Sequence, residues 1–249
     1  MRYNYKMTSE LTGQDVHDIL DVLNTTFGGW GDAAVFRWKY FDNPYGDSLH
    51  MIAYDGPQAV GSAGFWRNDL HETPAYQCVD LAVIPSHQRR GIFRVAASEC
   101  VTRLKGAYLY TFPNVDSRPG FLKMGWSLKR RMPISIHLPG GVLRRYEKRD
   151  PLPDNYAEWR FARHPSKRYY VCRLGGQSFL LSRRRSNCYA AGGMLSCDFG
   201  LQSVQPRFLV SYDFPDHPLW VPRRVGYQLE NPCYLAYEGF IPSYRSDTL

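Results

Sequence analysis

The residues in this chain best suited to chemistry form a basic turn between two apolar segments. Residues 79–84 are an apolar run, Pro85 ends it, and the turn of residues 86–91 carries Arg89 and Arg90. Apolar residues then recur at spacings of three and four, which predicts an amphipathic helix: Ile92, Val95, Ala96, Cys100, Val101 and Leu104. Such a strand, turn and helix direct the free amides of a helix N-terminus and two guanidinium groups at one point, where the helix dipole favours an anion. The pattern predicts a phosphate site, and the alternative is a solvated basic turn before an ordinary helix.

The turn also resembles the hallmark of the GCN5-related N-acetyltransferase (GNAT) superfamily. That hallmark is a strand ending in V-x-P, a Q/R-x-x-G-x-G/A turn, and a helix. The matching residues are Val83, Pro85, Gln88 and Gly91. The last position departs from the pattern, because Phe93 stands where the family usually has Gly or Ala, small enough for the backbone to approach the pyrophosphate of coenzyme A. Either the Phe93 side chain points into the helix packing, or the cradle for the pyrophosphate is altered.

A second match to the superfamily lies downstream, after the next apolar run. Family members commonly carry N-x-x-A-x-x-x-Y-x-K-x-G-F there. The residues at those spacings here are Asn114, Ser117, Lys123, Gly125 and Trp126. Two matches in the expected order are more specific than either alone. The resemblance implies an α/β (α+β) GNAT fold, a central mixed, mostly antiparallel twisted sheet flanked by helices, with acetyl-CoA as co-substrate.

In that family, coenzyme A lies along the strand and the turn. By resemblance, the backbone of residues 81–83 pairs with the pantetheine arm, because this strand splays from its neighbour and leaves N–H and C=O groups free. Asn114 is expected to contact the same arm. The residues expected to bind the cofactor are Leu81, Ala82, Val83, Gln88, Arg89, Arg90, Gly91, Ile92, Phe93, Arg94, Asn114 and Phe121.

The resemblance implies direct attack of a primary amine on an acyl thioester, without a covalent enzyme intermediate. The reaction needs an amide that polarises the carbonyl, an acceptor for the ammonium proton, and a group that protonates or tolerates the thiolate. Asp80 is the only carboxylate on the strand and is the candidate base, although an aspartate in such a strand is more often a turn or packing residue. The tyrosine that usually serves as the acid falls on Phe121, which has no proton to give. Tyr110 is therefore a candidate to assist, or positioning alone supplies the catalysis while water relays the proton.

These features predict an acyltransferase that moves an acetyl or short acyl group from coenzyme A to a primary amine of a small molecule, for example an amino sugar. The net charge of +8 predicts an anionic partner, such as an acidic or nucleotide-linked acceptor. One alternative is a protein that binds acyl-CoA without turning it over. Another is a nucleic-acid-binding module, suggested by the charge and by 15% aromatic residues, although no recognisable module is present.

Other chemistries find little support in the sequence. It contains no GxSxG, GxGxxG, Walker A, HExxH or EF-hand pattern. The six cysteines are scattered and form no CxxC, so we expect neither a metal site nor a disulfide framework. The N-terminus has no apolar signal-like segment and no apolar run could cross a bilayer, so we expect a cytoplasmic protein without a membrane partner. Nothing in the sequence indicates an oligomeric state.

The second half of the chain contains a segment that repeats a pattern of the first half. The segment WKYFDNP at residues 38–44 is matched by WRFARHP at residues 159–165, with the same interval from Trp to Pro. In both halves an apolar strand and a Gly turn follow. The sequence predicts a GNAT acyl-CoA-binding domain over residues 1–148, whose last strand lies near residues 127–137. Over residues 149–249 it predicts a degenerate GNAT-like copy without the cofactor turn, or else an unrelated β-rich extension.

Overall fold

A computed structural model of the chain describes residues 1–70, 73–133, 135–146, 150–211 and 225–231. Its described residues divide into two compact units, one comprising Met1–Lys129 with residues 228–231, the other Arg130–Tyr227. Part of the linker predicted near residue 148 lies outside the described residues, as does Cys233. Over the described ranges, no helix has both the length and the apolar character needed to cross a membrane.

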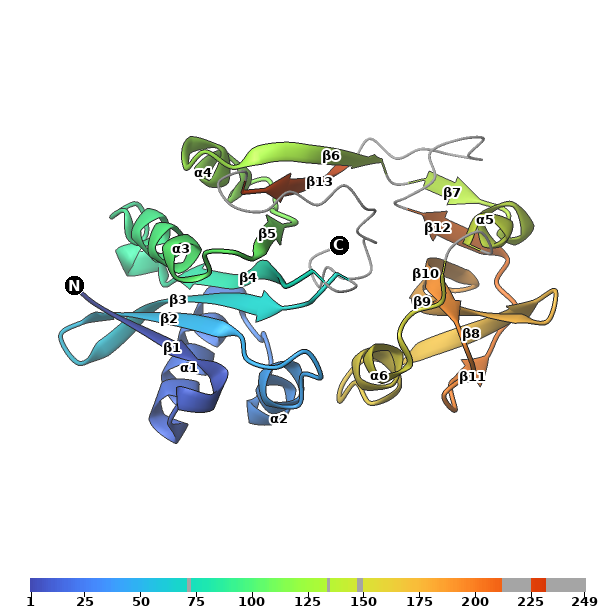
Figure 1. The fold of residues 1–249 in the computed structure, drawn as a ribbon, viewed down its shortest axis with the longest axis horizontal. Helices are drawn as coiled ribbons and strands as arrows, with labels where there is room; N and C mark the ends of the chain where they lie inside the picture. The colour runs from blue at the N-terminus through green and yellow to red at the C-terminus, as the bar shows by residue number, and fades with distance from the viewer. Residues whose placement is uncertain (71–72, 134, 147–149, 212–224, 232–249) are drawn as a thin grey trace. The chain divides into compact units, whose positions relative to one another are not determined.

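The first sheet has seven strands in the order β1-β2-β3-β4-β5-β13-β6 (Figure 1). β4 and β5 pair in parallel, whereas β1–β2, β2–β3, β3–β4 and β5–β13 pair antiparallel. Helices α1 and α3 lie on opposite sides of this sheet (Figure 1). The elements are β1 (Arg2–Met7), η1 (Thr8–Glu10), α1 (Gly13–Phe27), α2 (Ala33–Phe36), η2 (Arg37–Phe41), β2 (Leu49–Asp55), β3 (Gln58–Arg67), β4 (Ala75–Val83), η3 (Pro85–His87), α3 (Ile92–Arg103), β5 (Tyr108–Thr111), α4 (Arg118–Lys123), β6 (Ser127–Pro133) and β13 (Val225–Glu230). The predicted fold class is confirmed.

Local sequence explains where α1 begins and ends. The Thr12 hydroxyl accepts a hydrogen bond from the Asp15 amide, and the Asp15 carboxylate accepts one from the Thr12 amide at 2.7 Å, a capping box. Gly28 ends the helix with a φ of 69°, a left-handed conformation that glycine adopts without a steric penalty. Between them, Ile19 and Leu23 are buried and form part of the core.

Strand β4 carries a bulge and then separates from β5. The register with β3 shifts between Ser62 and Gly64, and Asp80 in the bulge has a φ of 51°. The parallel ladder between β4 and β5 covers only Ala75 to Gln77. The part of β4 beyond it therefore has no ladder on the β5 side, the splay that the family resemblance implied.

The second sheet has six strands in the order β11-β8-β9-β10-β12-β7. Its strands β8, β9, β10 and β12 repeat the arrangement of β2, β3, β4 and β5: two antiparallel pairings followed by a parallel one. β10 also carries a register shift, at Gly192. The elements are β7 (Ser135–His137), α5 (Pro139–Tyr146), α6 (Asp154–Ala157), η4 (Glu158–Ala162), β8 (Tyr169–Leu174), β9 (Gln177–Arg185), β10 (Cys188–Leu195), β11 (Gln202–Ser203) and β12 (Phe208–Ser211).

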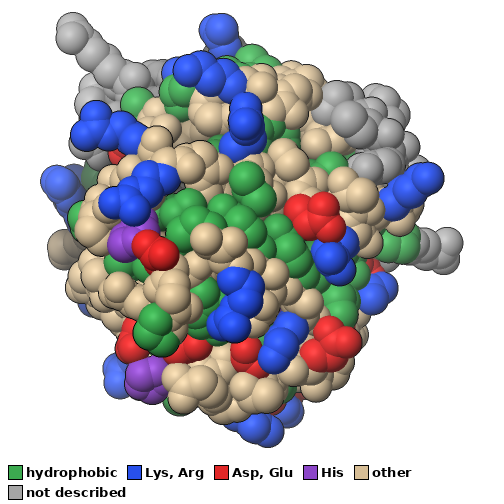
Figure 2. Space-filling view, turned by 90° about the vertical axis from the view of Figure 1, so that its left-hand side faces the viewer, with side chains coloured by type: hydrophobic (Ala, Val, Ile, Leu, Met, Phe, Trp, Pro, Cys, Tyr) green, Lys and Arg blue, Asp and Glu red, His purple; other side chains and the backbone are tan. Residues whose placement is uncertain are grey.

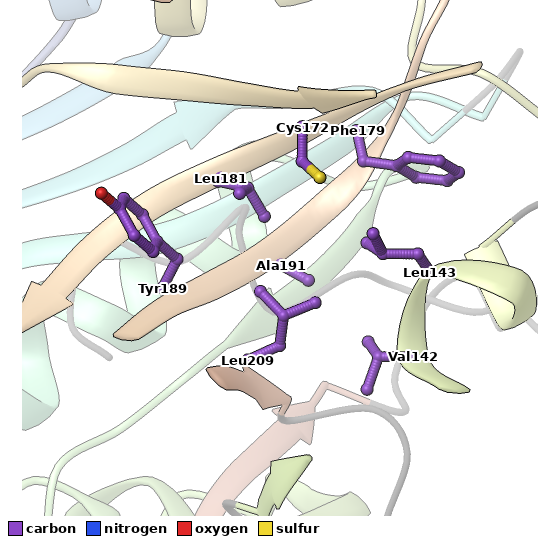
Figure 3. Close-up of a cluster of buried hydrophobic side chains, with 8 residues drawn as sticks. All are labelled: Val142, Leu143, Cys172, Phe179, Leu181, Tyr189, Ala191 and Leu209. Carbon is purple, nitrogen blue, oxygen red and sulfur yellow. The ribbon is translucent and has the colours of Figure 1, made fainter. Parts of the chain in front are cut away.

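A compact apolar cluster holds this second unit together (Figure 3). Val142 and Leu143 of α5 lie against side chains from the sheet. The cluster comprises Val142, Leu143, Cys172, Phe179, Leu181, Tyr189, Ala191 and Leu209. Residues 196–207, between β10 and β12, form no helix comparable with α3. The second unit thus repeats the sheet topology of the first without the helix that follows the basic turn.

The repeated segments at residues 38–44 and 159–165 each overlap an unusual helical turn in the structure. η2 and η4 are both π-helical, and each follows a four-residue α-helix. The Asp42 amide donates to the Arg37 carbonyl, and the Arg163 amide donates to the Glu158 carbonyl, each five residues back. Because π-helical turns are rare, their recurrence supports the duplicated half over an unrelated extension.

The two sheets exchange strands. The prediction of one terminal strand over residues 127–137 was wrong, because β6 joins the first sheet and β7 pairs with β12 in the second. In return β13, from late in the sequence, pairs with β5 in the first sheet. Short strands such as these carry no local signal of the sheet they join, because pairing depends on distant partners.

Candidate active site

A groove of about 740 Å³ lies in the first unit along the splayed part of β4. On the face shown in Figure 2, apolar side chains gather at the centre and lysine and arginine side chains surround them. The groove is lined by Thr26, Phe27, Leu81, Ala82, Val83, His87, Gln88, Arg89, Gly91, Ile92, Phe93, Arg94, Asn114, Asp116, Ser117, Gly120 and Lys123. Ten of the twelve residues expected to bind the cofactor are among them, and Arg90 and Phe121 are not. The structure therefore brings together the strand, the turn and the loop before α4, which are separate in sequence.

The turn at the end of β4 is tied back to the strand. The Gln88 side-chain amide donates to the Val83 carbonyl at 3.1 Å. Arg89 and Gly91 have φ values of 61° and 81°, so the chain reverses sharply before α3. Gly91 is the N-cap of α3 and has no side chain to accept from the amides of the first helical turn. Those amides are suited to bind an anion.

Phe93 packs on α4. Its ring meets the ring of Phe121 edge-on, with centroids 5.2 Å apart, and its Cε1 atom lies close to Gly120. Of the two alternatives left by the sequence, the structure shows the first, in which the side chain points into helix packing. The ring also contributes to the groove wall.

The loop before α4 is shaped by Asn114. Its side-chain oxygen accepts hydrogen bonds from the amides of Asp116 at 3.1 Å and Ser117 at 2.8 Å. These bonds hold the loop at the groove. Asp116, Ser117, Gly120 and Lys123 also line the groove but were not expected to bind the cofactor, although Ser117 and Lys123 belong to the matched motif. Thr26, Phe27 and His87 were missed as well, because the end of α1 carries no sequence signal of its proximity to β4.

Two predicted residues lie in the core instead of at the groove. Phe121 is buried between Phe93 and Trp126. Tyr110 is fully buried, its hydroxyl accepts a hydrogen bond from the Asn68 amide at 2.8 Å, and its ring stacks on Tyr108. The position of Tyr110 therefore does not support the predicted assistance to the reaction. The sequence alone did not reveal that Asn68 is its buried partner.

Asp80 is held by three donors. Its carboxylate accepts hydrogen bonds from the Trp30 indole at 2.8 Å and from the Tyr40 hydroxyl. It also forms an ion pair with Lys39 at 3.0 Å, and the Lys39 side chain is only 3% exposed. Asp80 itself is not part of the groove lining. The carboxylate of Asp80, predicted from the sequence as the candidate base, is thus hydrogen-bonded to Trp30 and Tyr40 and paired with Lys39.

Nearby titratable groups are held in their neutral forms. Burial, followed by the Lys39 ammonium, lowers the pKa of His50 to about 3. Burial raises the pKa of the Cys100 thiol to about 12 and that of Cys78 well above its usual range. Protonated buried thiols are poor nucleophiles. Within the described ranges, no group of three or more His, Cys, Asp or Glu side chains could hold a metal ion.

Comparison with known proteins shows which family the first unit is similar to. A family model described as "Acetyltransferase (GNAT) family" matches residues 16–126, a stretch that lies within the first unit. It contains the whole groove lining. No match was found among proteins of curated function.

Solved structures resemble the chain over both halves. A probable N-acyltransferase from Enterococcus faecalis V583 has a TM-score of 0.60 at 10% identity, covering 92% of this chain and 72% of its own. Eis1 from Mycobacterium abscessus has a TM-score of 0.56 at 12% identity, with coverage of 92% and 73%. A GCN5-related N-acetyltransferase from Kribbella flavida has a TM-score of 0.52 at 14% identity, with coverage of 91% and 71%. At these identities the likeness shows the fold, including that of the second half.

Proposed function

We propose that the chain is an acyltransferase of the GCN5-related N-acetyltransferase superfamily, whose family model matches residues 16–126, and that it transfers an acetyl or other short acyl group from coenzyme A to a primary amine of a small molecule. The observation that supports the proposal best is the groove, which combines the splayed edge of β4 with the basic turn before α3.

The groove has the chemistry that acetyl-CoA requires. The diphosphate would lie at the start of α3, where the uncapped amides after Gly91 and the guanidinium groups of Arg89 and Arg94 favour negative charge. The pantetheine arm, which carries amide groups, would pair with the backbone of Leu81 to Val83. Phe93 does not block this arrangement, because its ring packs on α4.

The proposed reaction is attack of the amine nitrogen on the thioester carbon. A backbone amide of the β4 bulge polarises the carbonyl, the carbon–sulfur bond breaks, and the thiolate leaves with coenzyme A. The ammonium proton passes to water and then to the thiolate, because Phe121 cannot donate a proton and Tyr110 is buried. Catalysis then rests mainly on positioning, which can supply several kcal/mol.

The charge of the chain bears on the identity of the acceptor. The net charge of +8 favours an acceptor that carries negative charge, such as a nucleotide-linked amino sugar. Simple amino sugars and polyamines form the natural comparison, because they carry the amine without the phosphate.

The experiment has two arms. Calorimetry of the full chain with acetyl-CoA tests binding, and release of free thiol from acetyl-CoA is followed with glucosamine, a UDP-linked amino sugar, spermidine and a short peptide as amines. We expect binding and amine-dependent thiol release. Binding without release from any amine would indicate a non-catalytic acyl-CoA-binding protein. The absence of heat with acetyl-CoA would reject the proposal, and tight, strongly salt-dependent binding of an oligonucleotide would favour a nucleic-acid role instead.

A further inference from the structure

The loop that follows α1 is rich in glycine and adjoins the groove. Residues 28–31 read Gly-Gly-Trp-Gly, and all three glycines have positive φ values, from 69° to 155°. Glycine gives a loop many accessible conformations, so a single loop shape depends on tethers from the side chains around it.

Side-chain hydrogen bonds tether this loop at two of its residues, Trp30 and Gly31. Asn24 of α1 pairs with the backbone of Gly31, donating to its carbonyl at 2.9 Å and accepting from its amide at 3.3 Å. Trp30 reaches the other way, and its indole N–H donates to the Asp80 carboxylate at 2.8 Å. The first tether stays within the loop's own neighbourhood, whereas the second connects the loop to the β4 bulge.

The Trp30–Asp80 hydrogen bond links two walls of the groove. Thr26 and Phe27, immediately before the loop, line one wall, and Leu81, immediately after Asp80, lines another. Neither Trp30 nor Asp80 lines the groove itself. Their bond therefore fixes how the end of α1 stands against the strand along which the pantetheine arm would run.

The carboxylate of Asp80 is poorly placed to accept a proton from an amine. It already accepts from Trp30 and Tyr40 and pairs with the buried Lys39 ammonium. To act as a base it would have to release a donor in a setting where separating a buried ion pair is costly.

The duplicated half supports a role beyond forming the bulge. The bulge in β10 has Gly192 at its extra position, where an added Cβ would lie 2.8 Å from Leu180 Cδ2. This second bulge therefore forms without any carboxylate. The half that has the carboxylate is the half that has the basic turn, α3 and the groove.

Resting on the proposed function, we propose that Asp80 is a positioning residue: through Trp30 it holds the loop of residues 28–31, and with it the wall formed by Thr26 and Phe27, against the cofactor strand. Asp80 thus keeps the groove in one conformation. The proton of the acceptor amine passes to water and not to Asp80.

Four variants of the full chain separate the hydrogen bond from the charge. Trp30→Phe removes the indole donor. The double variant Lys39→Met with Asp80→Asn removes both charges but keeps an oxygen for the Trp30 N–H, whereas Lys39→Met with Asp80→Gly removes that oxygen and suits the positive φ at residue 80. Tyr54→Phe is the matched control, because it deletes a 2.7 Å hydrogen bond between β2 and Asp18 of α1 away from the groove.

Hydrogen exchange of peptides covering residues 26–31 and calorimetry with acetyl-CoA are measured on all four. We expect about tenfold faster loop exchange and several-fold weaker acetyl-CoA binding for Trp30→Phe and for the glycine double variant, the scale of one lost hydrogen bond. The asparagine double variant and Tyr54→Phe should match the parent in both measurements.

Two results would overturn the inference. One is parental loop exchange in Trp30→Phe. The other is an asparagine double variant that keeps the loop protected yet releases no thiol with an amine that the parent acetylates, because that result would make Asp80 the base. If the parent itself gives no heat with acetyl-CoA, the proposed function fails, while the exchange measurement still tests the tether on its own.

Discussion

The ring of Phe93 packs so closely against Gly120 of α4 that a larger residue at position 120 would bring its Cβ atom into a clash with the ring. An ideal Cβ on Gly120 would be 2.7 Å from Phe93 Cε1, closer than such atoms approach in proteins. The aromatic residue at the start of α3 and the missing side chain in α4 are therefore complementary. The chain accommodates a bulky residue at the turn by leaving space for it in the neighbouring helix.

This complementarity can be tested with a double-mutant cycle. Gly120→Ala should force the Phe93 ring toward the groove and weaken acetyl-CoA binding by about three- to tenfold, because strained packing of this kind costs about 1 kcal/mol or more. Phe93→Ala in the same chain should restore binding, since it removes the clashing ring. Calorimetry of the two single variants and the double variant gives the comparison. Additive losses in the double variant would contradict the packing relationship.

Arg90 in the turn and Arg94 in the first turn of α3 should differ in importance for binding acetyl-CoA. Arg94 lines the groove and Arg90 does not. Arg94→Gln should weaken acetyl-CoA binding by about tenfold, the scale of one charge-assisted hydrogen bond, and should reduce its dependence on salt. Arg90→Gln is the matched control, with the same change of charge four residues earlier in the turn before α3, and should stay within about twofold. Equal losses in both variants would show that only the overall charge of the turn matters.

The stability of the first unit should depend on pH through His50. Burial lowers the pKa of His50 to about 3 in the folded protein, from 6.5 when it is solvated. The unfolded chain therefore takes up a proton as the pH falls below about 6.5 while the folded chain does not, so His50 contributes stability above that pH. The contribution declines by at most about 1.4 kcal/mol per pH unit down to about pH 3.

The measurement is the free energy of urea unfolding between pH 7 and pH 4, for the parent and for His50→Gln. Glutamine cannot titrate, so the variant should show a shallower loss of stability over this range, whatever its stability at pH 7. Identical slopes would mean that His50 is protonated in the folded protein or does not titrate on unfolding.

The exchange of strands predicts that the first half cannot fold alone. A fragment ending at residue 148 would lack β13, which pairs with β5 and brings Glu230 to the Tyr108 hydroxyl at 2.8 Å. An open hydrogen-bonding edge on β5 favours aggregation. We expect the fragment to show no cooperative thermal transition by circular dichroism, in contrast to the full chain. A sharp transition together with parental acetyl-CoA binding would contradict this expectation.

The parts of the site that could be predicted were those encoded by neighbouring residues. The apolar run of β4, Pro85 and the helical periodicity after Gly91 determine the strand, turn and helix almost by themselves. The repeated Trp-to-Pro interval predicted the second half for the same reason, because each copy is a local pattern.

The parts that could not be predicted depend on contacts between distant residues. The destination of the Phe93 ring depends on Gly120, and the burial of Tyr110 depends on Asn68. The engagement of Asp80 required Trp30, which is 50 residues away. A carboxylate next to a cofactor strand looks the same in sequence whether it accepts protons or holds an indole, since only its partners distinguish the two roles.

The late position of β13 affects the chain while it is being made. Tyr108 and Glu230 are 122 residues apart, so at a ribosomal rate of 5–20 residues per second about 6–24 s pass between their syntheses. Throughout that interval β5 has emerged without the neighbour that covers its outer edge. An unpaired strand edge favours aggregation, so slow translation of the second half would prolong the time for which β5 is exposed in this way.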